Sequence, residues 1–225
     1  METIKNKLFY WQENNIIQKT IISISNNDII ITSTDTVLGL LGNITQKSFE
    51  KITQIKGKRE DKPFIILVDS YYKIFNFVDQ KQFEQKPKIV NLLKKLWPGP
   101  LTVIFKAKDN LPAFLKSKEQ TIAIRCPNHA GLKKILKPFN GLFSTSANRS
   151  NQPIPQNYVQ IDSKILSEIT LIVVEKKDID TNNNLNQTLP STIIDVANCN
   201  NIKIIREGAL KLKELEDSYG EKFVK

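Results

Sequence analysis

The sequence predicts one α/β domain in which a twisted, mixed parallel and antiparallel sheet is flanked by helices. The chain has 225 residues, of which 40% are hydrophobic, enough for one large core. Short β-branched runs outnumber the helical segments but alternate with them in places, which favours a mixed sheet. Because no internal repeat, long linker or Gly/Ser-rich hinge divides the chain, we expect one domain over residues 1–209 and a C-terminal helix or tail over 210–225.

In the first half of the chain, the spacing of apolar residues separates strands from helices. We expect strands at 21–25, 29–33 and 64–68. The first two are β-branched, and the third is a continuous apolar run typical of a buried strand. We expect helices at 46–55, 70–77 and 87–96. In the first of these, Phe49, Ile52 and Ile55 fall on one helical face.

The second half of the chain is richer in short strands. The apolar and β-branched runs predict strands at 101–105, 121–124, 142–144, 171–174, 192–196 and 202–205. A short helix is expected at 130–136 and a terminal helix at 210–216. The Asn-rich stretch 182–187 follows a charged run, and we expect it to form a mobile loop.

Charge and composition narrow the functional classes. The formal net charge is +10, which favours an anionic partner such as a nucleotide or RNA, although a solvated Lys-rich surface is an equal alternative. Cys126 and Cys199 lack metal-ligand spacing, and His129 is the only histidine, so a zinc site is not expected. No apolar run approaches the roughly 20 residues of a membrane helix, and no signal peptide is recognisable. We therefore expect a cytoplasmic protein without membrane contact.

Five short segments interrupt the apolar pattern with polar, Gly or Pro residues, mostly beside predicted strands. They cover residues 33–40, 56–63, 97–102, 122–127 and 144–150. Strand ends are where α/β proteins commonly place ligand sites. The Pro-Gly-Pro turn in the third segment is best explained as structural. The hydroxyls and the carboxylate of the first segment can bind a polar ligand, but taken alone they favour capping of a following helix.

The basic segment carries Lys56, Lys58, Arg59 and Lys62 between a predicted helix and a buried strand. Such a cluster suits phosphate oxygens, since Lys supplies a point charge and Arg a planar fork. The alternative is a solvated turn, which most charge runs form. The apolar strand that follows the cluster directly favours a site.

Arg125 ends an apolar strand, where a buried guanidinium needs an anionic partner. That partner is either an acidic side chain of the protein or a substrate carboxylate. In the segment 144–150, Ser144, Ser146 and Asn148 follow apolar residues, and their hydroxyls and backbone N–H groups can hold phosphate. A Ser/Thr-rich turn is the alternative. Ser191 and Arg206 add a hydroxyl and a cation at two later strand boundaries.

Taken in order, these segments resemble the YrdC-like family of threonylcarbamoyl-AMP synthases. The matching motifs are TDTVxGL, KGKxxxKP, WPGPLT, AIRCP, STSANRS, STIIDV and IIREGA, which span about residues 32–209. The resemblance implies a twisted mixed sheet around a basic cavity. It also implies that L-threonine, bicarbonate or CO₂, and ATP with Mg²⁺ give threonylcarbamoyl-AMP and pyrophosphate for tRNA modification, and that a separate threonylcarbamoyl transferase acts next.

The resemblance also assigns residues to the two ligands. It places the nucleotide against Lys56, Lys58, Arg59, Lys62, Ser144, Ser146, Asn148 and Arg206. It places threonine against Thr34, Arg125 and Ser191, with Arg125 on the carboxylate. Catalysis would then rest on positioning and charge neutralisation, without a nucleophile or a general base from the protein.

Four positions depart from the family pattern. Lys58 stands where the family has Arg, so either Lys58 or the adjacent Arg59 is the main phosphate ligand. Ser33 replaces a proline, Leu38 replaces a tyrosine, and Asn151 replaces a glycine, where asparagine can adopt the same left-handed turn. Two alternatives stay open beside the enzyme: an RNA-binding module without ATP chemistry, and a carbamoyl-transfer domain of the hydrogenase-maturation type.

Overall fold

The computed structural model describes residues 5–57, 63–176, 189–197 and 202–223. Lys58, Arg59, Lys62, Cys199 and the stretch 182–187 lie outside the described residues. The strands are β1 (Leu8–Tyr10), β2 (Ile30–Thr32), β3 (Gly39–Asn43), β4 (Ile65–Leu67), β5 (Leu101–Lys106), β6 (Thr121–Arg125), β7 (Leu142–Ser146), β8 (Ile172–Val174), β9 (Thr192–Asp195) and β10 (Lys203–Arg206).

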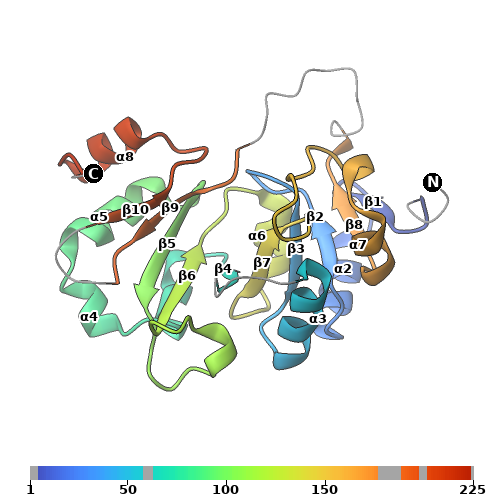
Figure 1. Cartoon of the computed structure of the whole chain (residues 1–225), viewed down its shortest axis with the longest axis horizontal. Coiled ribbons are helices and arrows are strands. Elements are labelled where there is room, and N and C mark those ends of the chain that lie inside the picture. The colour runs from blue at the N-terminus through green and yellow to red at the C-terminus, as the bar shows by residue number, and fades with distance from the viewer. Residues whose placement is uncertain (1–4, 58–62, 177–188, 198–201, 224–225) are drawn as a thin grey trace.

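The α-helices of the described residues are α2 (Ile16–Ser25), α3 (Gln46–Lys56), α4 (Gln80–Glu84), α5 (Pro87–Leu96), α6 (Ala130–Leu136), α7 (Ser163–Glu168) and α8 (Leu212–Tyr219). Short 3₁₀ helices are η1 (Tyr71–Asn76), η2 (Ala113–Leu115) and η3 (Tyr158–Gln160). Figure 1 shows α4, α5 and α8 beside the β5–β9–β10 end of the sheet, and α2, α3 and α7 beside the other end.

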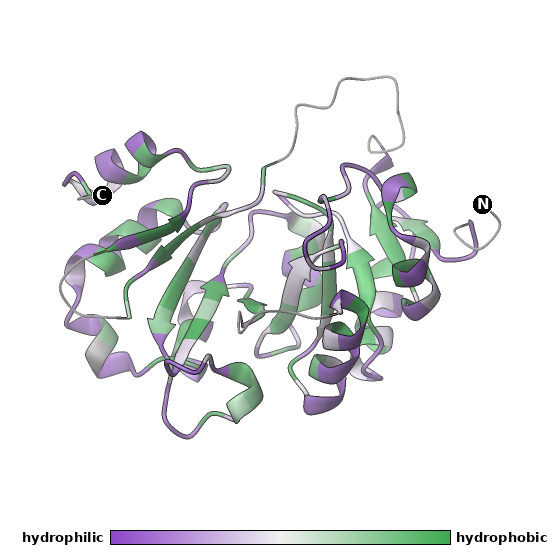
Figure 2. Ribbon diagram, in the orientation of Figure 1, coloured by the Kyte–Doolittle hydropathy of each residue, from purple (hydrophilic) through white to green (hydrophobic). Residues whose placement is uncertain are grey.

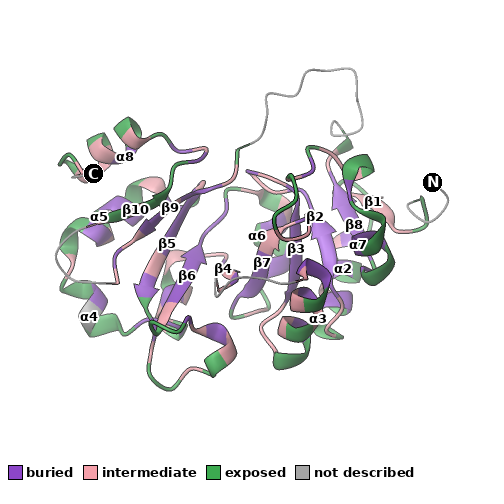
Figure 3. Cartoon of the chain, in the orientation of Figure 1, coloured by how far each residue is buried: buried purple, intermediate pink, exposed green. Residues whose placement is uncertain are grey.

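One sheet contains all the described strands, in the order β1-β8-β2-β3-β7-β4-β6-β5-β9-β10. The pairs β1–β8, β2–β8, β4–β6 and β5–β9 are parallel, and the remaining pairs are antiparallel. The predicted fold class, a mixed sheet flanked by helices, is therefore confirmed. Figure 2 shows that the hydrophobic residues concentrate in the strands, and Figure 3 shows that the strands are mostly buried while the outer faces of the helices are exposed.

Two apolar cores cover the two faces of the sheet. The larger core includes Phe143 on β7 and Ile52 on α3, and α5 and α8 pack on it through Leu92 and Leu215. The smaller core lies under α2 and α6 and includes Leu142 of β7. Because successive residues of a strand point to opposite faces, neighbouring β7 residues contribute to both cores. The large core is rich in aromatic contacts, among them Phe64 with Phe143 at 5.6 Å between ring centres.

Two of the expected elements differ from the structure. The predicted strand at 21–25 is wrong, because these residues lie inside helix α2. Ile16, Thr20 and Ile24 recur at four-residue spacing and are buried together, so packing against α6 outweighs the β preference of the isoleucines. The predicted helix at 70–77 is a 3₁₀ helix, η1.

The sequence prediction lacks two strands, β1 and β3, two α-helices, α4 and α7, and the short 3₁₀ helices η2 and η3. Strand β3 has the sequence Gly-Leu-Leu-Gly-Asn, whose two glycines hide the strand signal. Gly42 is needed in the sheet, because a Cβ there would stand 2.8 Å from Ile29 and 3.1 Å from Ile52. The other predicted strands and helices are confirmed with small shifts at their ends.

Candidate functional site

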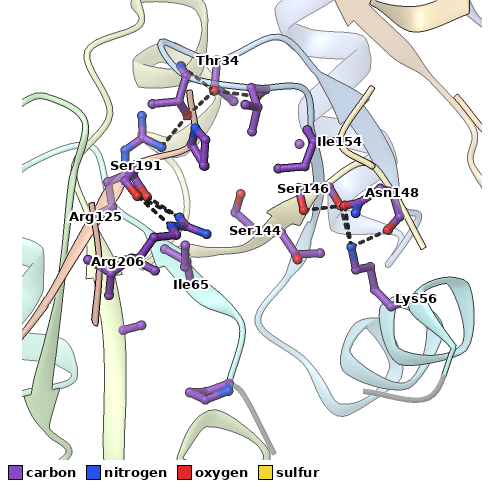
Figure 4. Close-up of a pocket in the computed structure, with 18 of the residues that line it drawn as sticks. Thr34, Lys56, Ile65, Arg125, Ser144, Ser146, Asn148, Ile154, Ser191 and Arg206 are labelled. Atoms are coloured by element: carbon purple, nitrogen blue, oxygen red, sulfur yellow. Dashed lines mark hydrogen bonds between the residues drawn. The ribbon is translucent and has the colours of Figure 1, made fainter. Parts of the chain in front are cut away.

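A cavity of about 820 Å³ lies on one face of the sheet (Figure 4). Part of its apolar lining comes from five neighbouring strands, through Ile65, Ala123, Ile104, Ile193 and Ile205. In-register pairing aligns Ser144 with Ile65, Ile65 with Ala123, and Ala123 with Ile104, so these side chains form a row across four strands. The floor of the cavity is therefore a continuous stretch of sheet.

Strand alternation also explains how polar residues reach this face. On β6, Ile122 and Ile124 belong to the large core, whereas Ala123 and Arg125 line the cavity. Most of the labelled polar side chains fall into two groups, which Figure 4 shows on opposite sides of the cavity, with Ser144 between them. The first group is Thr34, Arg125, Ser191 and Arg206, and the second is Lys56, Ser146 and Asn148.

Arg125 is 5% exposed and is held by three neighbours. Its Nε donates to the carbonyl of Gly99 at 3.2 Å, its Nη1 donates to Oγ1 of Thr36 at 2.9 Å, and its Nη2 pairs with the carboxylate of Asp35. Burial lowers the pKa of Arg125, and the Asp35 carboxylate opposes this shift, so the guanidinium remains charged. Of the two partners predicted for Arg125, the intramolecular acid is confirmed, and the substrate carboxylate stays a prediction.

The loop between β2 and β3 is organised by hydroxyl hydrogen bonds. Oγ1 of Thr34 donates to the carbonyl of Val37 at 2.8 Å and accepts from the backbone N–H of Thr36 at 3.0 Å. It also lies 3.0 Å from Oγ1 of Thr36. The expectation that these residues cap a following helix is wrong, because the segment leads into strand β3. The hydroxyls instead fold the loop at the edge of the cavity.

Arg206 and Ser191 form a second polar corner of the first group. Nη2 and Nε of Arg206 donate to the carbonyl of Ser191 at 2.8 and 3.2 Å. The hydroxyl of Ser191 lies 2.8 Å from that of Thr102. The Arg206 side chain is exposed to the cavity yet surrounded by protein, and this partial desolvation, with a smaller contribution from the charge of Arg125, lowers its pKa.

Lys56 ends helix α3 on the opposite side and is 5% exposed. Its Nζ donates to the carbonyl of Ser146 at 2.9 Å, to Oδ1 of Asn148 at 3.0 Å and to the carbonyl of Asn148. Ser146 also donates its hydroxyl to Oδ1 of Asn148 at 2.5 Å. Gly57, with φ of +73°, ends the helix. Lys56 therefore ties the end of α3 to the loop that follows β7.

Every predicted site residue that the structure describes lines this one cavity. These residues are Thr34, Lys56, Arg125, Ser144, Ser146, Asn148, Ser191 and Arg206. Asn151 has φ of 64°, so the left-handed turn expected in place of glycine is confirmed. Leu38, another departure from the family pattern, is 7% exposed and packs in the large core.

Sequence reasoning missed two kinds of site residue. The apolar floor was missed, although its period-two alternation with core residues on β5, β6 and β9 was a usable signal. Thr36 and Asp35 were noted only as part of a polar segment, and their contact with Arg125 joins positions about ninety residues apart. No local pattern encodes a pairing of that separation.

The described lining of the cavity contains hydroxyl, amide and carbonyl oxygens but no carboxylate, apart from Asp35 behind Arg125. No cluster of three or more His, Cys, Asp or Glu side chains suited to a metal occurs among the described residues. These groups do not form an all-protein metal site, whereas Mg²⁺ is commonly carried into such cavities by substrate phosphates.

The fold and the cavity together define an α/β protein with a ligand-sized site, built on a sheet face between two polar groups of side chains. The chain belongs to the Sua5/YciO/YrdC family, whose model, described by the words "Telomere recombination", matches residues 23–208. Among curated relatives, the threonylcarbamoyl-AMP synthase of Pseudoalteromonas translucida is 28% identical over 184 residues, which cover 81% of this chain and 94% of the relative.

Solved structures share this fold. The crystal structure of Sua5 from P. abyssi in complex with L-threonine matches with a TM-score of 0.80 and 25% identity, over 97% of this chain and 62% of that one. The crystal structure of YciO from E. coli matches with a TM-score of 0.76 and 20% identity, over 93% of this chain and 99% of that one. None of the described helices has both the length and the apolar character that spanning a bilayer requires.

Proposed function

We propose that this chain is an L-threonylcarbamoyladenylate synthase, which converts L-threonine, bicarbonate or CO₂, and ATP into threonylcarbamoyl-AMP and pyrophosphate. The observation that carries the proposal is the meeting of two polar groups across one apolar floor in a single cavity (Figure 4). The first group, around Arg125, suits an amino-acid carboxylate, and the second, around Lys56, suits phosphate. Similarity to threonylcarbamoyl-AMP synthases supports the same assignment.

The chemistry needs positioning more than it needs a protein nucleophile. The threonine amine adds to CO₂, loses a proton and becomes a carbamate. A carbamate oxygen attacks the α-phosphorus of ATP, a new P–O bond forms, and the bond to the β,γ-pyrophosphate breaks. Each partner is anionic, so holding both in one cavity requires cations on each side, and this is the main contribution of the protein.

On the threonine side, Arg125 binds the carboxylate, and Ser191 lies within the same polar group as Thr34. Of the five guanidinium N–H groups of Arg125, three point to Gly99, Thr36 and Asp35. The remaining two are available for a carboxylate that enters the cavity. The apolar floor accepts the less polar parts of the bound substrates.

On the nucleotide side, Lys56 acts through its charge and through the loop that it orders. Its ammonium donates to oxygens of Ser146 and Asn148, so a phosphate meets a preformed loop beside a buried positive charge. Ser144, which lies between the two groups, and Arg206, which reaches the cavity from the first group, are the other proposed nucleotide contacts. Lys58, Arg59 and Lys62, which lie outside the described residues, stay predicted nucleotide ligands, and Mg²⁺ accompanies the phosphates of ATP.

The product is a mixed anhydride that must be passed to another enzyme. We infer that a separate threonylcarbamoyl transferase uses it to modify an adenosine of tRNA in the cytoplasm. The net charge of +10 is compatible with direct contact between this chain and RNA.

The test is pyrophosphate release by the purified chain with ATP, Mg²⁺ and bicarbonate, measured with and without L-threonine. We expect release that depends on threonine. Omission of bicarbonate under CO₂-depleted buffer should suppress it, which separates carbamate chemistry from simple aminoacyl activation. Absence of release, together with salt-sensitive binding of RNA, would replace the proposal with the RNA-binding module.

A further inference from the structure

We propose that Thr36 is a positioning residue that fixes the guanidinium of Arg125 for substrate binding, with Asp35 as its charged counterpart. The inference rests on the proposed function, because it concerns the threonine side of the same cavity. Thr36 is 5% exposed, and its hydroxyl is 2.9 Å from Nη1 of Arg125. It acts through Arg125, which is the residue that meets the carboxylate.

The directions of the hydrogen bonds follow from the donors available. Arg125 can only donate, so Oγ1 of Thr36 accepts from it. The Thr36 hydroxyl proton then points to Oγ1 of Thr34, and the Thr34 proton points to the carbonyl of Val37 at 2.8 Å. This arrangement gives each of these hydrogen bonds one donor and one acceptor. The guanidinium is thus connected through two hydroxyls to the backbone of the β2–β3 loop.

This relay changes the role expected of Thr34. Its hydroxyl donates to Val37 and accepts both from the backbone N–H and from the hydroxyl of Thr36, so its one proton and two lone pairs are all in use. Its methyl group lies close to Gly39, 3.7 Å from where a Cβ would stand on that cavity-lining residue. Thr34 therefore supplies shape to the cavity and an acceptor to Thr36, rather than a hydrogen bond to substrate.

Asp35 holds the same guanidinium through its charge and joins it to a second loop. One carboxylate oxygen pairs with Nη2 of Arg125, and the other accepts from the backbone N–H of Asn128 at 2.9 Å. Removing this carboxylate would leave a buried cation unpaired and would also remove a charge that repels the substrate carboxylate. Those two effects change the threonine affinity in opposite directions. Thr36 is neutral, so its substitution removes hydrogen bonds without changing the charge beside Arg125.

The experiment compares Thr36→Val with Thr36→Ser in the full chain. Valine keeps the shape but removes the hydroxyl, and serine keeps the hydroxyl. Thr32→Val is the matched control, because Thr32 is fully buried on the preceding strand and its hydroxyl has no hydrogen-bond partner in the structure. We expect Thr36→Val to raise the KM for threonine about tenfold, the loss of one hydrogen bond to a charged group, with the KM for ATP changed less than about twofold.

Thr36→Ser and Thr32→Val should both keep the wild-type KM for threonine. An unchanged threonine KM in Thr36→Val, or equal rises in both KM values, would overturn the inference. If Thr36→Val does not fold, Thr36→Ala takes its place with the same criteria. Threonine binding is also measured by calorimetry. If the wild-type chain binds threonine but releases no pyrophosphate, the proposed function is refuted. The threonine affinities of the variants then still decide the role of Thr36. A wild-type chain that binds no threonine overturns both.

Discussion

Replacing Lys56 with methionine is expected to lower both stability and ATP use, because one buried ammonium orders the whole loop after β7. Its Nζ donates to two carbonyls and one side-chain oxygen of Ser146 and Asn148. Hydrogen bonds from a charged group contribute about 1.5–3 kcal/mol each, and contacts that share one donor are not additive. Methionine has a similar length and fills the space, so we expect a net loss of about 3 kcal/mol.

Urea unfolding measures the stability change, and pyrophosphate release as a function of ATP concentration measures the functional change. Lys47→Met is the matched control, since Lys47 is an exposed residue of the same helix. We expect a lower unfolding midpoint with an unchanged m-value in Lys56→Met, and a KM for ATP raised more than the KM for threonine. A midpoint equal to that of Lys47→Met would refute the assigned role of Lys56, and so would a selective loss of threonine affinity.

Three further predictions test other parts of the account. Arg125→Ala should raise the KM for threonine by on the order of a hundredfold, because a charged hydrogen bond to the carboxylate is lost, and it should raise the KM for ATP far less. Equal rises in the two KM values, measured by steady-state kinetics, would contradict this prediction. Gly208→Ala should destabilise the chain by about 1–3 kcal/mol in urea, because its Cβ would stand 2.1 Å from the carbonyl oxygen of Pro190; wild-type stability would contradict it. Burial raises the pKa of Cys126 to about 11 from 9.0, so the unfolded thiol ionises first and stability falls as pH rises from about 9 to 11. Cys126→Ala should remove about 2–3 kcal/mol of that pH dependence, and parallel stability curves for the two proteins would contradict it.

The sequence was most informative where one face of an element packs against a single neighbour. Helix α5 begins and ends where its apolar stripe does, and its residues Ile89, Leu92 and Leu93 are buried as expected. Helix α6 was equally predictable. In both, the three-to-four residue spacing reflects one simple contact surface. Helix α2 was not predictable in this way, because its isoleucines carry a strand preference that only its packing against α6 overrides.

The membership of the site could be predicted, but its internal contacts could not. The motifs identified Arg125, Lys56 and Ser146 as site residues, and the structure places all three in one cavity. The contacts that orient them depend on the register of strands far apart in the chain. Arg125 meets Thr36 only because β6 and the β2–β3 loop converge over the sheet. Local patterns carry no information on that convergence.

The hydrogen bonds of single residues add detail that the motifs do not carry. Thr34 was expected to contact threonine, but its hydroxyl is used entirely within the loop. Lys56 was expected on the phosphates, and its three donors point to oxygens of Ser146 and Asn148. In each case the residue lines the cavity as predicted, its contact with a ligand stays a prediction, and the count of donors and acceptors shows which intramolecular contacts hold it.

The most direct test of the central claim is detection of the intermediate itself. The purified chain is incubated with ATP, Mg²⁺, L-threonine and isotopically labelled bicarbonate. The nucleotides are then separated, and their masses are measured by mass spectrometry. We predict an AMP adduct that carries both the threonyl group and the label, and that disappears when any one of the three substrates is omitted. An adduct without the label, or pyrophosphate release without any adduct, would contradict the joint binding of all three substrates in this cavity.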